Sequence, residues 1–316
     1  MNDSSVKHKV RDERAGMRLD KLVHELFEIP WSRTRKLIEL GKISVDGRIT
    51  RDLSFPVESG QTVVHDPLAR RVHALEGFDP QCIRYLDTHI LVASKPSGVL
   101  TLPFERGDKG SFLGQLKAHL ARTRPQTKKR RGPLPSLMTV HRLDKGTSGL
   151  IVFARTRTAK EGLATQFKEH SVSREYLALV HGAAKSKKIE TRIMDDRGDG
   201  IRGSRESSPN GDAKASPRSR IAITIVQLEK TYNGASLVSC RLKTGRTNQI
   251  RIHMSEEGHP LLGETTYLRG FKGQRIDAPH LMLHATSLEF VHPVSGEKLA
   301  FREPWPETFK QVISKL

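Results

Sequence analysis

Apolar side chains recur every three or four residues near the start of the chain, which is the spacing of an amphipathic helix. They predict a helix over residues 19–27, ended by Pro30, and a second helix that closes at Gly41. The stretch ISVDGRIT follows, where two β-branched runs flank Asp46 and Gly47, a dipeptide typical of tight hairpin turns. The pattern therefore predicts a small unit of two helices and a hairpin.

Beyond residue 80, short apolar runs are separated by turn residues, which is typical of strands. The apolar run at residues 150–154 indicates a buried strand, and residues 158–170 form a polar, mostly helical segment. Further strands are expected at residues 90–93, 174–182, 221–227, 235–242 and 280–293.

The stretch RLKTGRTNQIRIH combines strand-like alternation with polar chemistry. After the turn at Arg246, period-two alternation predicts a strand with Gln249, Arg251 and His253 on one face. Arg251 would then be held on a rigid element, where its planar guanidinium suits a carboxylate or a phosphate. His253 and His259 have no third ligand at a recognisable spacing, so no metal site is expected here.

Charge and turn content predict how the chain is divided. The linker is expected in DPLARRVHALEGFD, which holds a proline and a charged run. The stretch ARTRPQTKKRRGP, residues 121–133, carries six cations and no anion, and is either a solvated loop or an RNA contact. The expected parts are a disordered leader at 1–15, a first domain at 16–66, a linker at 67–80 and a second domain at 81–316 with a flexible basic insertion at 185–220.

Composition points to an anionic partner. The 316 residues include 54 Lys plus Arg against 35 Asp plus Glu, a net charge of +19. Nucleic acid is the obvious polyanion, although a merely basic protein would have the same composition. No run of 18 apolar residues is present, and Cys82 and Cys240 are too few for a disulfide framework or a zinc site. We expect a cytoplasmic protein that uses no cofactor.

The stretch HRLDKGTSGL, residues 141–150, concentrates the candidate chemistry. One carboxylate, Asp144, lies between Arg142 and Lys145 and just before a turn that leads into the buried strand. Opposite charges favour the ionised form of a carboxyl group, so Asp144 is expected to be charged. Taken alone, this pattern fits a nucleophile, an electrostatic anchor or an ordinary surface salt bridge.

The first domain resembles the small α-L RNA-binding domain found in a bacterial small-subunit ribosomal protein. The likeness covers roughly fifty residues, from MRLDKLVHELF through the basic helix to GKISVDG. It implies that the domain docks on RNA and that Arg33, Arg35, Lys36 and Lys42 meet phosphates.

The second domain resembles the RluA-type pseudouridine synthases. The motifs appear in order from about residue 83 to residue 305: ILVASKPSGV, HRLDKGTSG, REYLALVHG, TGRTNQIRIH with GHPLLGETTY, and LMLHATSLEFVHP. The resemblance implies an α+β fold, in which flanking helices pack on a mixed, largely antiparallel sheet. Because an RNA-docking domain precedes it, the chain further resembles the members that modify large-subunit ribosomal RNA.

The resemblance also implies roles for particular residues. Asp144 is expected to be the essential carboxylate and to pair with Arg251. Arg142 would hold the space left by the flipped uridine, Tyr176 would stack on the uracil, and Ile250 would line the pocket under it. The remaining expected substrate contacts are His141, Arg246 and Gln249.

Three positions depart from the usual pattern of the family. Asn248 stands where His is common, Glu264 where Asp is common, and Arg174 where a Lys commonly precedes the tyrosine. The first two substitutes can still hydrogen-bond and the third keeps its charge, so catalysis is expected to be retained.

The chemistry of uridine isomerisation needs no cofactor or metal, because the N1–C1′ bond is exchanged for a C5–C1′ bond without oxidation. Asp144 could attack C1′ or remove the C2′ proton, and the sequence favours neither. Two other functions stay open: a synthase acting on transfer RNA, and a catalytically silent RNA-binding assembly factor. We expect a monomer.

Overall fold

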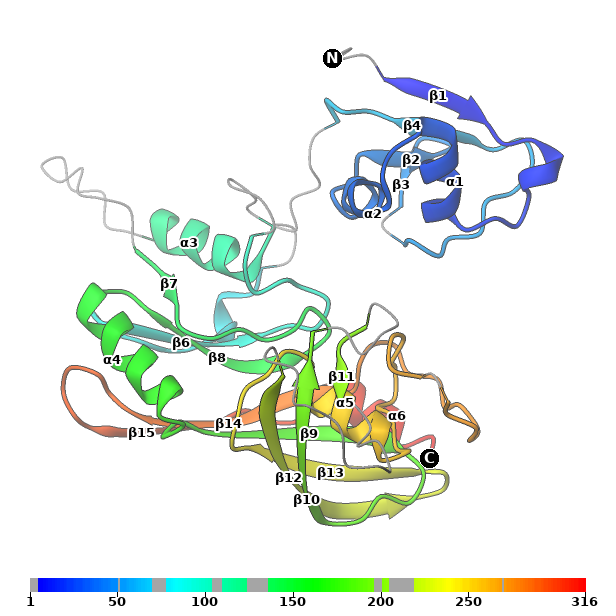
Figure 1. Cartoon of the computed structure of the whole chain (residues 1–316). Helices are drawn as coiled ribbons and strands as arrows, with labels where there is room; N and C mark the ends of the chain where they lie inside the picture. The colour runs from blue at the N-terminus through cyan, green and yellow to red at the C-terminus, as the bar shows by residue number, and fades with distance from the viewer. Residues whose placement is uncertain are drawn as a thin grey trace, which may run out of the picture. The chain divides into compact units, whose positions relative to one another are not determined.

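The computed structural model describes residues 5–50, 52–69, 78–103, 110–123, 136–195, 201–204, 219–268 and 270–316. The chain forms two compact units, Met1–Glu76 and Gly77–Leu316 (Figure 1). Most of the expected linker and of the basic stretch at 121–133 lies outside the described residues.

The first unit packs two helices on a small antiparallel sheet. The helices are α1 (Leu19–Phe27) and α2 (Trp31–Glu39). The sheet has the order β1 (Val6–Lys9), β4 (Thr62–His65), β2 (Ile43–Val45) and β3 (Arg48–Ile49). The predicted hairpin is confirmed: β2 and β3 pair across Asp46 and Gly47, both of which have positive φ.

The predicted disordered leader is wrong for the described residues of this segment. β1 pairs with the free edge of β4, so that Val6 opposes His65, and the short helix η1 (Asp12–Arg14) follows. Val10 is buried at 2% exposure, and the ring of His8 packs edge-on against Phe27 at 5.0 Å. A polar sequence is therefore ordered here by the backbone bonds of a neighbouring edge strand, which its composition does not reveal.

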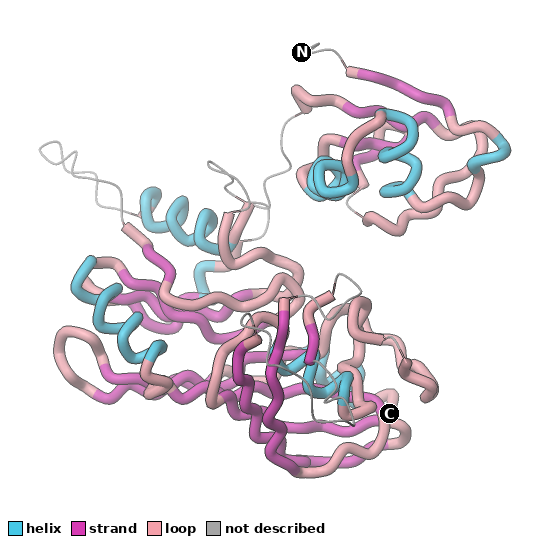
Figure 2. The backbone as a smooth tube through the Cα atoms, viewed as in Figure 1, coloured by secondary structure: helices cyan, strands magenta, loops and turns pink. Residues whose placement is uncertain are grey.

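The second unit is built on one large sheet (Figure 2). The strand order is β11-β10-β12-β13-β9-β14-β8-β6-β5, with β15 added to β14 and β7 added to β8. Among the described strands, β8 and β14 form the one parallel pair, so the predicted mixed, largely antiparallel sheet is confirmed. The strand bounds are β5 (Ile83–Leu86), β6 (Ile90–Lys95), β7 (Met138–Thr139), β8 (Ser148–Ala154), β9 (Ser173–His181), β10 (Lys187–Met194), β11 (Gly203–Ser204), β12 (Arg220–Tyr232), β13 (Ala235–Leu242), β14 (Leu283–Val291) and β15 (Lys298–Arg302).

Helices cover both faces of this sheet. On one face, α3 (Phe112–Arg122) and α5 (Gln249–Glu256) belong to one continuous apolar core with alternate residues of β6, β8, β9 and β13. On the other face, α4 (Arg157–Lys168) packs on β6 and β8, and α6 (Glu307–Ile313) packs on β9 and β13. The short helix η2 (Pro80–Cys82) begins the unit. Because both faces are covered, every residue of β8 is buried.

Two sequence predictions are wrong in this unit. The stretch from Gln249 is helix α5, because its buried residues follow a helical spacing: residues 249, 250, 252, 253 and 254. The segment expected to be a flexible insertion from 185 begins with strand β10, which buries Ile189 and Ile193 against the sheet. The later part of that insertion, residues 196–200 and 205–218, lies outside the described residues.

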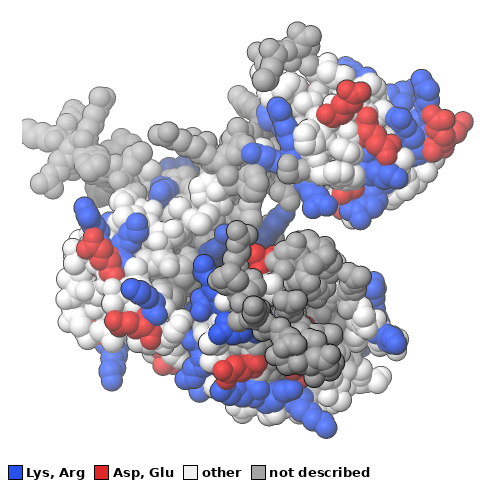
Figure 3. Space-filling model, in the orientation of Figure 1, with Lys and Arg blue, Asp and Glu red and all other residues white. Residues whose placement is uncertain are grey.

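The surface is rich in basic side chains. Figure 3 shows Lys and Arg spread over the visible face, where they cover more area than Asp and Glu. Among the described residues, no helix is both long and apolar enough to cross a bilayer.

We predict that Gly149→Ala disrupts the junction between β8 and β14. Gly149 has φ +104, and a Cβ there would lie 2.2 Å from the carbonyl oxygen of Ala285, which is backbone and cannot rotate away. The free energy of unfolding should fall by about 3 kcal/mol in denaturant titrations. Gly258→Ala is the matched control, since Gly258 has φ +79 but open space around it, and should cost only about 1 kcal/mol. Equal losses would contradict the prediction.

Candidate active site

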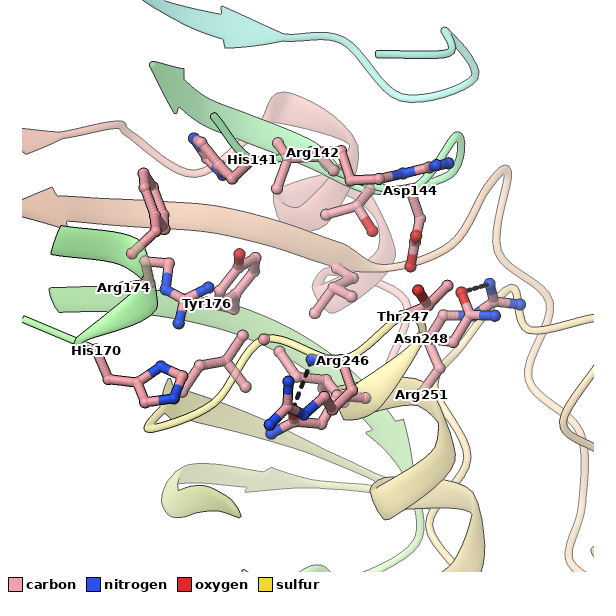
Figure 4. Close-up of a pocket in the computed structure, with 18 of the residues that line it drawn as sticks. His141, Arg142, Asp144, His170, Arg174, Tyr176, Arg246, Thr247, Asn248 and Arg251 are labelled. Atoms are coloured by element: carbon pink, nitrogen blue, oxygen red, sulfur yellow. Dashed lines mark hydrogen bonds between the residues drawn. The ribbon is translucent and has the colours of Figure 1, made fainter. Parts of the chain in front are cut away.

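The pocket that collects the predicted residues has a volume of about 500 Å³ and is lined mainly by four segments. These are the loop before β8, the end of α4 with the residues after it, the start of β9, and the turn that leads into α5. Figure 4 shows Asp144 and Arg142 above Thr247, Asn248 and Arg251, with Tyr176 and Arg174 to the left of both groups. Asp144 is the single carboxylate among the described residues that line this pocket.

The loop that carries Asp144 is fixed by hydrogen bonds to the segment after β6. The Thr101 hydroxyl donates to the carbonyl of Leu143 at 2.6 Å and accepts from its N–H at 3.1 Å. The Ser97 hydroxyl donates to the carbonyl of Gly146 at 2.7 Å, on the other side of Asp144. The carboxylate is therefore positioned by a rigid backbone that is bonded on both sides of it.

A buried lysine supports the same loop. Lys95 is 1% exposed, and its ammonium donates to the carbonyls of Pro96, Val99 and Lys145 at 2.9, 2.8 and 3.3 Å. Burial lowers the pKa of Lys95 to about 7, although the negative charge of Asp144 acts in the opposite direction. The sequence analysis did not single out this residue, because a lysine in a turn gives no sign of its burial.

Burial dominates the electrostatics of Asp144 itself. Desolvation raises the pKa of this half-buried carboxyl group, and the positive charges of Arg251, Arg142 and Lys95 only partly oppose the rise. The sequence analysis expected these cations to keep the carboxylate fully charged. Burial outweighs these cations, so the pKa of Asp144 lies above that of an exposed aspartate.

Arg251 lies near Asp144 but is held by a different carboxylate. Its guanidinium makes a two-pronged pair with Glu264, with Nε and Nη2 each 2.7 Å from a carboxylate oxygen. Arg251 acts on Asp144 as a charge, while no direct hydrogen bond or ion pair joins them among the described residues. Where the resemblance led us to expect a pair with Asp144, the described residues therefore show Arg251 paired with Glu264, and Asp144 feels only the electrostatic effect of the Arg251 charge.

Glu264 is built to stay ionised. Its carboxylate is completely buried and accepts from the backbone N–H groups of Thr265 and Thr266 at 2.9 and 2.8 Å. Burial alone would raise the pKa of Glu264, but the hydrogen bonds and charge of Arg251 and these N–H groups lower it.

Asn248 links the same pair to the turn before α5. It has φ +58, a left-handed conformation that asparagine tolerates better than most residues. Its side-chain oxygen accepts from Arg251 at 2.9 Å, and its amide donates to the hydroxyl of Tyr267 at 3.0 Å. Two of the three departures from the family pattern, Asn248 and Glu264, thus both contact Arg251.

Tyr176 and Ile250 provide the apolar part of the pocket. Tyr176 is 7% exposed, and burial raises the pKa of its phenol. Ile250 is 4% exposed on α5 and shares the apolar core with Tyr176. Both side chains line the pocket, as the sequence analysis expected.

His141 is held as a neutral ring. Its Nε2 accepts from the backbone N–H of Val152 at 3.1 Å, and its ring stacks on Phe167 at 4.5 Å. Burial and the nearby charge of Arg174 lower the pKa of His141 to about 3. The ring therefore shapes the pocket wall and does not act as a cation.

Gln249 is oriented into the protein. Its amide oxygen accepts from the Thr244 hydroxyl and the Arg246 backbone, and its amide nitrogen donates to Ile223 and Thr224, all within 3.0 Å. With these four bonds made, Gln249 is a support of the turn, whereas the sequence analysis expected a substrate contact. Arg246 lines the pocket, and its Nε donates to the carbonyl of Ile221 at 2.9 Å.

The residues predicted to meet phosphates in the first unit differ in their surroundings. Arg33 and Arg35 are exposed on α2, and Lys36 is half-buried on the same helix. Lys42 instead donates to the backbone carbonyls of Pro67, at 2.7 Å, and Ala69. Arg33 and Arg35 are therefore better placed than Lys42 to meet RNA.

Pocket residues that the sequence analysis did not identify as site residues include Phe167, Thr247 and Arg174. Within the described residues, no group of three or more His, Cys, Asp or Glu side chains could hold a metal ion.

Two known family profiles match the chain. The profile of the RNA pseudouridylate synthase family matches residues 89–256, which is more than half of the chain, and the profile of the S4 domain matches residues 17–63. The chain belongs to the RNA pseudouridine synthases. The resemblance to the RluA type is confirmed, and the protein is an RNA-binding enzyme of this family with an N-terminal S4 domain.

Relatives align over nearly the whole chain. Ribosomal large subunit pseudouridine synthase D from Zymomonas mobilis is 33% identical, with 96% of this chain and 95% of the relative covered. The protein of the same name from Xanthomonas campestris is 34% identical, with 99% and 93% covered. The solved structure of human RNA pseudouridylate synthase domain containing 4 shares the fold, with a TM-score of 0.58 at 19% identity over 74% of this chain and 92% of that one.

We predict that Glu264→Gln destabilises the protein and weakens catalysis together, because it leaves the charge of Arg251 buried without its partner. The free energy of unfolding should fall by about 3 kcal/mol at neutral pH. A depressed pKa contributes stability above the unfolded pKa, and this is lost as pH falls through the folded pKa. The gap between wild type and variant should therefore shrink in acid.

The matched control is Glu307→Gln, which removes an exposed carboxylate that is 3.1 Å from Lys310. It should change the free energy of unfolding by less than about 0.5 kcal/mol. An equal effect of the two variants in denaturant titrations would contradict the role given to Glu264.

Proposed function

We propose that this synthase isomerises uridine to pseudouridine in large-subunit ribosomal RNA, with Asp144 as the essential carboxylate. The observation that carries the proposal is the position of Asp144, the one carboxylate among the described residues of a pocket whose other lining residues are basic, neutral polar or apolar. The ribosomal substrate is supported by the names of the two bacterial relatives and by the S4 domain.

The reaction exchanges one bond for another. The N1–C1′ bond breaks, the uracil turns while it stays in the pocket, and C5 bonds to C1′. The C5 proton then leaves and N1 gains a proton, so the composition of the RNA does not change. Asp144 either attacks C1′ to form a sugar ester or removes the C2′ proton to form a glycal, and both routes need its ionised form.

The neighbouring residues supply positioning. Tyr176 offers a buried ring on which a flipped uracil can stack, and Ile250 forms the apolar wall beside it. Arg142 is exposed at the rim, where it can take the space that the uridine leaves in the RNA. Arg251, fixed by Glu264, keeps a positive charge near the carboxylate. No step calls for a metal or a cofactor, and we propose that the enzyme acts as a cytoplasmic monomer.

Pseudouridine mapping of ribosomal and transfer RNA, from cells with and without the gene, tests this function. Specific large-subunit uridines should lose the modification and regain it with wild type but not with Asp144→Asn. Loss confined to transfer RNA would overturn the substrate. No change in either RNA would contradict synthase activity and would favour a function as an RNA-binding assembly factor.

We predict an acidic limit of the rate that lies above the ordinary aspartate range. Since burial raises the pKa of Asp144 from 3.8, the reactive carboxylate is lost as pH falls through that higher value. Single-turnover rates at saturating RNA, measured between about pH 4 and 8, should fall at low pH with the dependence expected for protonation of a single group.

His141→Asn is the control for this prediction. The pKa of His141 is already lowered to about 3, so its removal should leave the midpoint of the acidic limb in place. A rate that stays constant down to about pH 4, or a midpoint that disappears with His141, would contradict the assignment to Asp144.

We also predict that the S4 domain contributes affinity through exposed arginines. Arg33→Gln combined with Arg35→Gln should weaken binding to large-subunit ribosomal RNA about tenfold or more at physiological salt. The reason is that binding releases fewer counterions from the RNA when two phosphate contacts are lost. Filter-binding titrations would measure this. Arg11→Gln, which removes an exposed arginine of the same unit before α1, should have little effect.

A further inference from the structure

One cation in the pocket has no counterpart in the catalytic scheme. Arg174 is 8% exposed, yet its guanidinium makes no hydrogen bond or ion pair with any described residue, and its Nε is fully buried without a partner. Buried charges in proteins are normally paired, because an uncompensated one is costly. Arg174 therefore offers an unpaired positive charge to whatever enters the pocket that it lines.

The strand register explains why Arg174 lacks an internal partner. Successive side chains of β9 point to opposite faces, so Arg174 lies on the same face as Tyr176, toward the pocket. The neighbouring carboxylate, Glu175, points to the other face, where it is 3.4 Å from Arg241. The nearest acid in sequence is thus turned away from the pocket.

The surroundings hold the guanidinium in place without neutralising it. It lies over the ring of Phe167, with its central carbon 5.6 Å from the ring centroid. On another side stands Gly245, where an added Cβ would come within 2.6 Å of Nη1 of Arg174. Because Gly245 has no side chain, there is room beside it for the guanidinium of Arg174.

This end of the pocket is positively charged and open. Lys168 and His170 line it from the end of α4 and are exposed, and Arg246 lines it from the turn before α5. Among the described lining residues, Asp144 is the single acid, and Figure 4 shows it on a different wall from Arg174. An anionic partner for Arg174 would therefore have to come from a molecule that binds in the pocket.

We infer that Arg174 binds a phosphodiester group of the RNA strand, at the nucleotide that carries the target uridine. The inference rests on the proposed function, since RNA is the polyanion that this pocket would receive. The uracil is neutral when it enters, so the permanent charges that RNA offers to a buried guanidinium are its phosphates. Arg174 would thus hold the flipped nucleotide by its backbone while Tyr176 holds the base.

The direct test uses synthetic RNA that carries a mapped target uridine and has a neutral methylphosphonate at either its 5′ or its 3′ phosphate. At one of the two positions the neutral group should weaken binding by wild type about tenfold and binding by Arg174→Met less than twofold. Arg174→Met should also reduce the slope of log affinity against log salt by about one contact. Arg174→Lys, which keeps a charge, should recover part of the affinity.

Two further variants test whether the position of the Arg174 guanidinium, and not merely the number of positive charges, determines phosphate binding. Gly245→Ala keeps the charge but displaces the guanidinium, and should reproduce the binding defect of Arg174→Met. Arg157→Met removes an exposed arginine that pairs with Glu161 on α4 and should leave the methylphosphonate effect unchanged. If methylphosphonates at both positions affect wild type and Arg174→Met equally, the inference is overturned.

Stability separates a binding role from a structural one and needs no RNA. Because Arg174 carries an unpaired buried charge, Arg174→Met should have an unchanged or higher Tm, and inorganic phosphate should raise the Tm of wild type more than that of the variant. A lower Tm of Arg174→Met with an equal phosphate response would overturn the inference. If wild type binds RNA with the expected phosphate dependence but forms no pseudouridine, the proposed function fails and the inference stands.

Discussion

Keeping one carboxylate available for ionisation inside a partly dry pocket is the constraint around which the catalytic unit is arranged. Desolvation pushes Asp144 toward its neutral form, and three cations oppose it from different elements. Two of these cations are held in place. Lys95 is held by backbone carbonyls and Arg251 by Glu264, so groups that do not line the pocket help to set the electrostatic field at Asp144.

The sheet brings these groups together from distant parts of the sequence. β8 begins four residues after Asp144 and lies between β6, which ends at Lys95, and β14. The closest approach is at Gly149, where the backbone of β14 leaves no room for a side chain. This tight junction, together with the hydrogen bonds from Ser97 and Thr101, fixes the backbone on which Asp144 lies.

Much of this arrangement could be predicted from the sequence, and the failures have physical causes. In the second unit the apolar runs located β6, β8, β9, β12, β13 and β14, and the stretch around Asp144 located the pocket. The stretch from Gln249 was misassigned because a short alternating segment satisfies strand and helix patterns alike, and only the buried set in the structure distinguishes them. β1 was missed because its order comes from a neighbouring strand edge. The burial of Lys95 and the true partner of Arg251 depend on contacts across the fold, which no local pattern encodes.

The fit between Arg174 and Gly245 has a consequence for how such sequences can diverge. The two positions lie on different elements, yet the wide guanidinium at one occupies the space that a missing side chain leaves at the other. A chain with a lysine at the first position has a narrower head group and could accept alanine at the second in place, whereas in a chain with arginine the alanine would displace the guanidinium. Residue size at the two positions is therefore expected to covary among related enzymes, even though neither position needs to change the reaction.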